Sequence, residues 1–144
     1  MRIIAGKYRG TALANVGKGD TAAHLRPTSD RVRESLFSML THHDVIHGAR
    51  VLDLFAGTGA LGLEALSRGA TEVCFVENGR VGQKLLRENI EKLRAEAETV
   101  LMRNDATRLG SWPNAAFDLV FLDPPYGKGM GQTAPRSILL LCVA

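Results

Sequence analysis

The residues with the clearest chemical potential are Asp-Pro-Pro-Tyr at 123–126, which follow the largely apolar run 117–122. A carboxylate and a carbonyl oxygen in a stiff turn can accept hydrogen bonds from an amino group, because proline fixes φ and removes a backbone donor. A neighbouring aromatic ring gives an extruded base a face for stacking. This set predicts a site for methylating the exocyclic amine of a base, unless the turn merely ends a strand. The candidate catalytic residues are Asp123, Pro124, Pro125 and Tyr126.

A second pattern lies upstream, where the apolar segment 51–55 runs into a glycine-rich turn at 56–62. Glycines let the backbone approach a ligand closely, and the N–H groups that begin a helix attract a carboxylate or phosphate. The letters fit the dinucleotide fingerprint G-x-G-x-x-G, and Glu77 stands where a ribose-binding acid is expected. A nicotinamide dehydrogenase is therefore a rival interpretation, and a glycine turn with no ligand is another.

Asp53 favours a cationic ligand over a dinucleotide. It stands inside the strand before the glycines, where it suits a pyrophosphate poorly but can reach an ammonium or sulfonium group. S-adenosylmethionine carries both charges and is the predicted cofactor. A third acid, Asp105, follows the segment 99–102, where an adenine ring could be recognised. The candidate cofactor-binding residues are Asp53, Phe55, Ala56, Gly57, Thr58, Gly59, Glu77, Asn78, Asp105 and Ala106.

Strands alternating with helices must position these groups. Such alternation predicts a parallel sheet with right-handed crossovers, in which ligands gather at the carboxyl ends of the strands. The fold class is therefore α/β and Rossmann-like. The predicted strands are 51–55, 72–76, 99–102 and 117–122.

Helices are predicted between these strands and before the first one. The earliest begins after Pro27 with Thr28 or Ser29 as its N-cap, and carries Arg31 and Glu34 on its outer face. Another follows the glycine turn to about residue 67, and a third runs from about 80 to 96. The predicted buried face of the first helix consists of Val32, Leu36, Met39 and Leu40. The predicted buried stripe of the third consists of Val81, Leu85, Leu86, Ile90 and Leu93.

Positive charge is concentrated near the N-terminus. The formal net charge is +3, but residues 1–50 hold eight Lys or Arg against four Asp or Glu, whereas the remainder holds ten against eleven. Residues 2–15 alternate around Gly6 and Gly10 and predict a small hairpin. The basic residues of this N-terminal part either form a phosphate-contacting surface beside the active site, whose affinity for nucleic acid falls as salt rises, or form a solvated face without a partner. The basic candidates are Arg2, Lys7, Arg9, Arg26, Arg31 and Arg33.

Length and composition predict one soluble domain. The 144 residues are 45% hydrophobic, and no run is long and apolar enough to cross a membrane. The two cysteines, Cys74 and Cys142, form no disulfide framework, so we expect a monomer in the reducing cytoplasm. The histidines at 42–47 cluster at a predicted helix end, where this residue is favoured without a ligand, and no metal site is predicted.

Taken together, these motifs resemble the class I S-adenosylmethionine-dependent methyltransferases, and more closely the RsmD-like family of 16S ribosomal RNA guanine-N2 methyltransferases. The resemblance covers residues 1 to about 127. It rests on the segments Arg-Ile-Ile-Ala-Gly at 2–6, Arg-Pro-Thr at 26–28, Asp-Leu-Phe-Ala-Gly-Thr-Gly at 53–59, Asn-Asp at 104–105 and Asp-Pro-Pro-Tyr at 123–126.

The resemblance implies a Rossmann-like sheet with an N-terminal hairpin arm and methyl transfer to N2 of a guanine in 16S ribosomal RNA or the small subunit. Asp53, Gly57 and Gly59 would line the methionine end of the cofactor, Glu77 would hold the ribose, and Asp105 would lie by the adenine. Residues 123–126 would position the guanine. Arg26 and Thr28 would lie near the pocket, and the basic hairpin would contact the RNA. A DNA adenine-N6 methyltransferase shares the last motif and is the alternative.

The pattern departs from the family after Tyr126, because members normally continue with another helix and three more strands. The expected organisation is an arm at 1–25 and a methyltransferase domain at 26–144 that is truncated after the Asp-Pro-Pro-Tyr motif. The apolar run 138–143 is a candidate strand that lacks a crossover helix before it. A truncated or frame-shifted product is the expectation, which leaves an inactive fragment that at most binds cofactor or RNA as a further alternative.

Overall fold

The computed structural model of the chain describes residues 1–15, 29–103, 117–123 and 139–142. The predicted roles that lie outside the described residues are those of Arg26, Thr28, Asp105, Ala106, Pro124, Pro125 and Tyr126.

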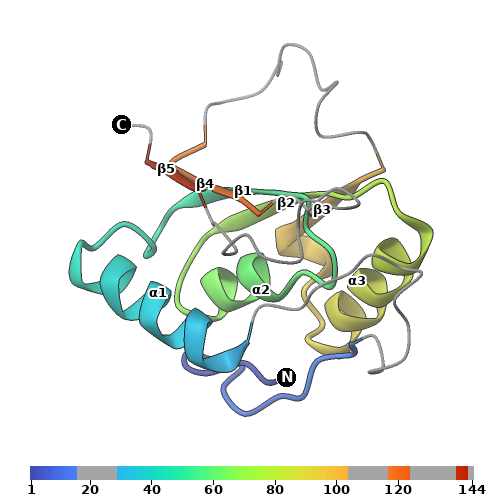
Figure 1. The fold of residues 1–144 in the computed structure, drawn as a ribbon, viewed down its shortest axis with the longest axis horizontal. Coiled ribbons are helices and arrows are strands. Elements are labelled where there is room, and N and C mark those ends of the chain that lie inside the picture. The colour runs from blue at the N-terminus through green and yellow to red at the C-terminus, as the bar shows by residue number, and fades with distance from the viewer. Residues whose placement is uncertain (16–28, 104–116, 124–138, 143–144) are drawn as a thin grey trace, which may run out of the picture.

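Five strands form one sheet in the order β3-β2-β1-β4-β5 (Figure 1). The first four are parallel, which confirms the predicted α/β class and the predicted strand positions. Apolar residues predominate in these strands because the face of the sheet that helices cover is buried. The strands are β1 (Arg50–Leu54), β2 (Glu72–Val76), β3 (Thr99–Met102), β4 (Leu119–Leu122) and β5 (Leu139–Cys142).

β5 pairs with β4 in the antiparallel sense, with Leu122 opposite Leu139 and Leu119 opposite Cys142. An antiparallel neighbour needs no helical crossover, whereas a parallel one does. Residues 139–142 of the apolar run therefore form a strand, as predicted, and in this orientation the pairing requires no crossover helix.

Three helices lie on one side of the sheet, with α2 between α1 and α3 (Figure 1). All eight residues of α2 are buried, because this helix is apolar almost all round and lies against β1 and β2. Among the described residues, no helix is long and apolar enough to cross a membrane. The elements are α1 (Asp30–His42), α2 (Ala60–Ser67), α3 (Arg80–Lys92) and a 3-10 turn, η2 (Glu96–Glu98).

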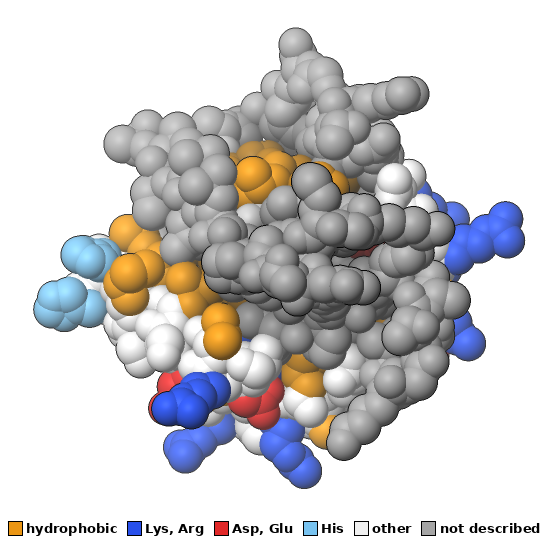
Figure 2. Space-filling model, in the orientation of Figure 1, with side chains coloured by type: hydrophobic (Ala, Val, Ile, Leu, Met, Phe, Trp, Pro, Cys, Tyr) orange, Lys and Arg blue, Asp and Glu red, His pale blue; other side chains and the backbone are white. Residues whose placement is uncertain are grey.

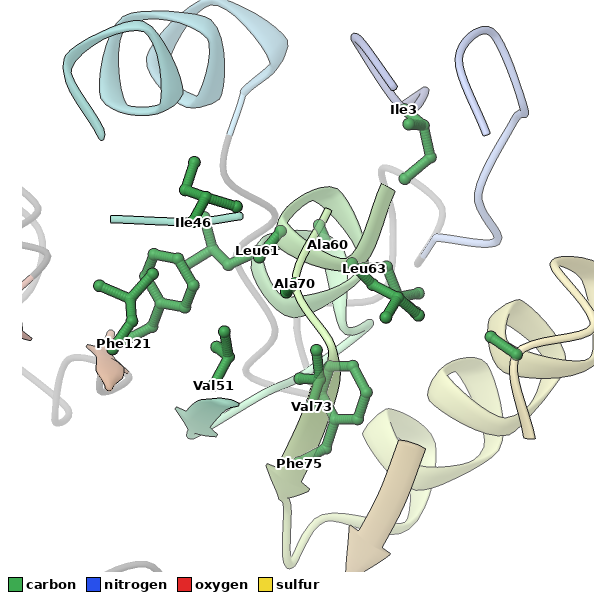
Figure 3. Packing of buried hydrophobic residues seen from close by; sticks show 14 of the residues in the cluster. Ile3, Ile46, Val51, Ala60, Leu61, Leu63, Ala70, Val73, Phe75 and Phe121 are labelled. Atoms are coloured by element: carbon green, nitrogen blue, oxygen red, sulfur yellow. The ribbon is translucent and has the colours of Figure 1, made fainter. Parts of the chain in front are cut away.

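The core fills the layer between the sheet and the helices. Figure 3 shows Val51, Phe75 and Phe121 from three neighbouring strands around Leu61 and Leu63 of α2. Complete burial of side chains of this size contributes about 1.5–3 kcal/mol each. The core therefore fixes how β1, β2 and β4 lie beside one another, and with them the positions of the strand ends.

The predicted buried face of α1 is only partly confirmed, because Leu40 is buried and Leu36 packs against the core but the other two residues are exposed. Ser29 caps the helix as predicted, by accepting a hydrogen bond from the Val32 N–H. Val32 and Met39, however, are 48% and 47% exposed. The buried side chains are Arg33, Phe37 and Leu40. The helix is rotated relative to the apolar pattern because the buried carboxylate of Glu64 in α2 pairs with Arg33.

The predicted extent of α3 is also corrected. The helix ends at Lys92 rather than near 96, and Arg94 adopts a positive φ of 52° before η2 begins. Leu86, Ile90 and Leu93 are buried as predicted, whereas Val81 is 39% exposed.

Residues 1–15, named the arm from here on, fold back on themselves and pack against α2 and α3. Arg2 and Ala12 form an antiparallel bridge, which is the predicted hairpin in a short form. Gly6 lies directly on α2 with a φ of +92°, and a Cβ there would stand 1.9 Å from the Ser67 carbonyl oxygen. Ile3 and Leu13 belong to the main hydrophobic core. The arm is therefore fastened to the body of the molecule along its length.

Candidate active site

The strand order brings three predicted acids to one edge of the sheet. β1 lies between β2 and β4, so the strand order runs outward from β1 to β3 on one flank and resumes with β4 on the other, and such a reversal of strand order is a switch point where ligands bind. Asp53 is in β1, Glu77 follows β2, and Asp123 follows β4. Since the strands are parallel, their carboxyl ends meet at this edge. Adjacent strands therefore deliver three carboxylates to the same region.

The glycine turn between β1 and α2 has a sharply bent backbone. Phe55, Gly57 and Gly59 have positive φ values of 56°, 58° and 84°. The Gly59 N–H donates to the Ala56 carbonyl at 2.9 Å, which closes the turn. A Cβ on Gly59 would lie 2.2 Å from Cδ1 of Leu86, so this position requires glycine for space as well as for conformation.

Glu77 fixes the glycine turn from the side. Its Oε1 accepts a hydrogen bond from the Gly57 N–H at 2.8 Å, and its Oε2 accepts one from the Gly79 N–H at 2.9 Å. A carboxylate oxygen can accept two hydrogen bonds, so both oxygens keep acceptor capacity for a hydroxyl group of a ligand. Asn78, beside it, is exposed.

Asp53 is almost fully buried, with 1% of its surface exposed, and its Oδ2 accepts from the Gly62 N–H at 3.0 Å. Burial raises the pKa of its carboxyl well above the ordinary value of 3.8. The negative charges of Asp123 and Glu77 raise this pKa further, while the hydrogen bond from Gly62 lowers it. A cation in this region would relieve the repulsion among the three carboxylates. The arrangement therefore suits a positively charged ligand.

Stability at different pH values is expected to report this cluster. The unfolded chain gives up the Asp53 proton near pH 3.8, whereas the folded chain keeps it to higher pH. Asp53 therefore lowers the free energy of unfolding as the pH rises from 3.8 through the folded pKa. Asp53→Asn retains an acceptor for the Gly62 N–H, but its free energy of unfolding is not expected to fall over this pH range. The variant is therefore expected to be more stable than the wild type at pH values above the folded pKa of Asp53.

Urea unfolding across this pH range measures the difference between the two proteins. If the free energy of unfolding changed with pH in the same way for wild type and Asp53→Asn, folding would not raise the pKa of this carboxyl group.

Asp123 is 8% exposed and stands one residue beyond β4. In the register of the sheet, Leu122 lies opposite Leu54, so Asp123 reaches the level of the glycine turn. Its charge lies close enough to Asp53 to raise the pKa of that carboxyl. An acceptor here can hold the N–H of a substrate beside a ligand on the turn.

Four of the basic candidates lie on the surface of the arm and the start of α1. Arg2, Lys7, Arg9 and Arg31 are exposed, and Lys and Arg side chains gather along the lower edge in Figure 2, where Figure 1 places the arm and the start of α1. The Lys7 N–H donates to the carbonyl of Ser67, which is the last residue of α2. The glycine turn lies at the other end of this helix, immediately before its first residue. The arm's bend is thus roughly 10 Å along the α2 axis from the turn.

The prediction that Arg33 contacts RNA is wrong. Its side chain is completely buried, its Nη1 donates to Oε1 of Glu64 at 3.2 Å, and its Nη2 donates to the Arg2 carbonyl at 2.9 Å. A phosphate cannot reach it without unfolding α1. Arg33 joins α1, α2 and the arm instead.

Asn89 and Glu64 are buried polar residues that hold the elements around the site and were not among the predicted site residues. Asn89 falls three residues after Leu86 and four before Leu93, on an apolar stripe, and Glu64 interrupts the apolar segment 60–67. A polar residue inside an apolar stripe is the signal that could have identified them, because buried polar groups need partners. Among the described residues, no group of three or more His, Cys, Asp or Glu is arranged to hold a metal ion.

Comparison with known proteins gives a consistent result. The sequence model of the family described as "Conserved hypothetical protein 95" matches residues 1–140. The ribosomal RNA small subunit methyltransferase D of Haemophilus influenzae is 39% identical over 147 residues, which cover 99% of this chain and 70% of that protein. The protein of the same name from Escherichia coli K12 is 41% identical over 130 residues, or 90% of this chain and 62% of that protein.

The solved structure of yhhF from Escherichia coli superposes with a TM-score of 0.73 at 41% identity, over 90% of this chain and 67% of that one. The chain thus spans 62–70% of the length of these three proteins.

Proposed function

The chain belongs to the Conserved hypothetical protein 95 family. We propose that it methylates N2 of a guanine in 16S ribosomal RNA, with S-adenosylmethionine as the methyl donor. The names of the relatives from Haemophilus influenzae and Escherichia coli support a small-subunit ribosomal RNA substrate. The observation that carries the proposal is the meeting of Asp53, Glu77 and Asp123 around the glycine turn.

The described residues fit the cofactor. Asp53 and Glu77 supply negative charge at the glycine turn, and the raised pKa of Asp53 means that its anion is destabilised in the absence of a nearby cation. We assign Asp53, Gly57 and Gly59 to the methionine end and Glu77 to the ribose hydroxyls. When bound, the cofactor supplies an activated methyl group on a sulfonium, which is an excellent leaving group.

The protein's contribution to the reaction is chiefly orientation. The lone pair of an exocyclic amine is delocalised into the base, so the N–H bonds must be held for the lone pair to aim at a methyl group. Asp123, together with the carbonyl of Pro124, is assigned this role. Near-attack positioning of this kind lowers a barrier by up to roughly 7–11 kcal/mol. A strong base is not required, because a methylated ammonium releases its proton readily.

Exposed cations supply the proposed RNA surface. Arg2, Lys7, Arg9 and Arg31 present positive charge on the arm and the start of α1. Phosphate contacts by such residues weaken as the salt concentration rises, because bound counterions are released on association.

The expected result of a labelling assay is methyl transfer to small-subunit RNA. The chain is incubated with labelled S-adenosylmethionine and either undermethylated small subunits or unmethylated DNA, and the nucleic acid is digested to nucleosides. Label in N2-methylguanosine supports the proposal. Label in N6-methyladenine identifies a DNA adenine methyltransferase instead, and the absence of label from both contradicts transfer by this chain.

Thermal melting separates an inactive binder from a chain that binds nothing. A ligand present at 100 times its dissociation constant stabilises a folded protein by about 2.7 kcal/mol. Stabilisation without transfer identifies a cofactor-binding fragment, whereas an unchanged melting temperature contradicts the cofactor assignment as well.

A further inference from the structure

Asn89 connects the arm to the glycine turn through one side chain. Its Oδ1 accepts a hydrogen bond from the Ala14 N–H at 2.6 Å, and its Nδ2 donates to the Ala14 carbonyl at 3.2 Å. The same Nδ2 donates to the Thr58 carbonyl at 2.9 Å. Ala14 belongs to the arm and Thr58 to the glycine turn, so a single amide spans two segments that are 44 residues apart in sequence.

The hydrogen-bonding groups around Asn89 match those of an amide and fix which way its oxygen and nitrogen point. Asn89 is fully buried, and its three partners comprise one N–H donor and two carbonyl acceptors. An amide has one acceptor and two N–H donors, so its inventory matches these partners and its orientation is fixed by them. Asn is an unfavourable residue within a helix, which makes a purely helical role for this position a poor explanation.

The Thr58 carbonyl lies between Gly57, which Glu77 holds, and Gly59, which packs against Leu86. The turn is thus fixed from β2 by Glu77 and from α3 by Asn89. A shift of Ala14 alters the geometry of the amide, and the amide can keep its bond to Thr58 only if the turn follows.

We propose that Asn89 is a positioning residue that couples the arm to the glycine turn, so that cofactor binding at the turn and RNA binding on the arm strengthen each other. This rests on the proposed function, since the turn must take the cofactor and the arm must take the RNA. Coupling between two binding sites is reciprocal, so a cofactor that orders the turn must also order the arm. The arm's order can therefore be measured without RNA.

The test is amide hydrogen exchange of residues 2–14 with and without saturating S-adenosylhomocysteine, the demethylated cofactor. In the wild-type chain we expect the ligand to slow exchange in the arm by roughly fivefold or more, the lower end of typical allosteric coupling. Asn89→Ala is expected to bind the ligand while losing this slowing. Glu88→Ala, at an exposed position next to it in α3, is the matched control and is expected to retain it.

Ala14→Pro provides a second route that leaves the core residue in place. Proline lacks the N–H that donates to Asn89, so this variant removes the shorter of the two hydrogen bonds between Ala14 and the amide and leaves only the bond to the carbonyl. Ligand-dependent slowing is expected to be clearly smaller than in the wild type, even where Asn89→Ala does not fold.

The outcomes distinguish this inference from the proposed function. Ligand binding to the wild type without any change in arm exchange overturns the coupling alone, as does equal slowing in wild type and Ala14→Pro. A wild-type chain that binds no S-adenosylhomocysteine overturns both, and the labelling assay then shows the failure of the proposed function independently.

Discussion

Asp123→Ala is expected to reduce methyl transfer by roughly 10²–10³-fold, the usual effect of removing one hydrogen-bonding group that acts on the reacting atoms. Cofactor affinity is expected to stay the same or to rise. The reason is electrostatic: the Asp123 charge raises the pKa of Asp53, so its removal makes Asp53 easier to ionise and a better partner for a cation. Turnover should therefore fall without any fall in cofactor affinity.

Asp123→Asn is the companion variant. Asparagine keeps one acceptor oxygen and the size of the side chain but loses the charge, so we expect an activity between those of wild type and Asp123→Ala. Titration calorimetry with S-adenosylhomocysteine and the labelling assay measure the two properties separately. A parallel loss of binding and turnover in both variants would show that Asp123 is a structural residue at the end of β4.

Glu64→Ala is expected to lower the free energy of unfolding by about 3–5 kcal/mol, as is typical when one partner of a buried ion pair is removed. Glu64 is fully buried in α2. Its Oε1 accepts from Arg33 at 3.2 Å and from the Ile4 N–H at 2.9 Å, and its Oε2 accepts from Arg68 at 2.9 Å and from the Ala5 N–H at 3.1 Å.

The size of the effect follows from what remains after the substitution. Arg33 would stay buried with only Asp30, which is 52% exposed, as an ion-pair partner, and two N–H groups of the arm would lose their acceptor. Typical domains are stable by only about 5–15 kcal/mol, so the loss is a large share of the total. The arm is expected to detach first, since Ile4 and Ala5 belong to it.

Urea unfolding measures this loss, with Glu34→Ala as the control. Glu34 is an exposed glutamate on α1, and such surface substitutions change stability by about 0.5 kcal/mol or less. Proteolysis with trypsin, which cleaves after Arg9 in the arm, should also become faster in Glu64→Ala. A free energy of unfolding equal to that of Glu34→Ala would mean that the buried ion pairs contribute nothing to stability.

The strand positions and the gathering of acids could be predicted from the sequence, because they depend on short-range properties. A run of apolar residues such as 73–76 favours a buried strand whichever position in the sheet it occupies. Parallel strands share a carboxyl edge, so acids that end such runs must meet there. Asp53 and Glu77 were therefore predicted as cofactor residues and Asp123 as a catalytic residue from their positions at strand ends, whereas Asp105 and residues 124–126 lie outside the described part of the chain.

Only the tertiary structure decided which polar residues are buried. Arg33 was predicted to be exposed on α1, because periodicity treats an arginine as a surface residue. Its burial depends on Glu64, 31 positions away, and Asn89 is buried because Ala14 and Thr58 supply partners from distant segments. A local pattern fixes which residues favour water, but a polar group can leave water where distant partners replace its hydrogen bonds, and those partners are brought together only by the packing of the arm, α2 and α3.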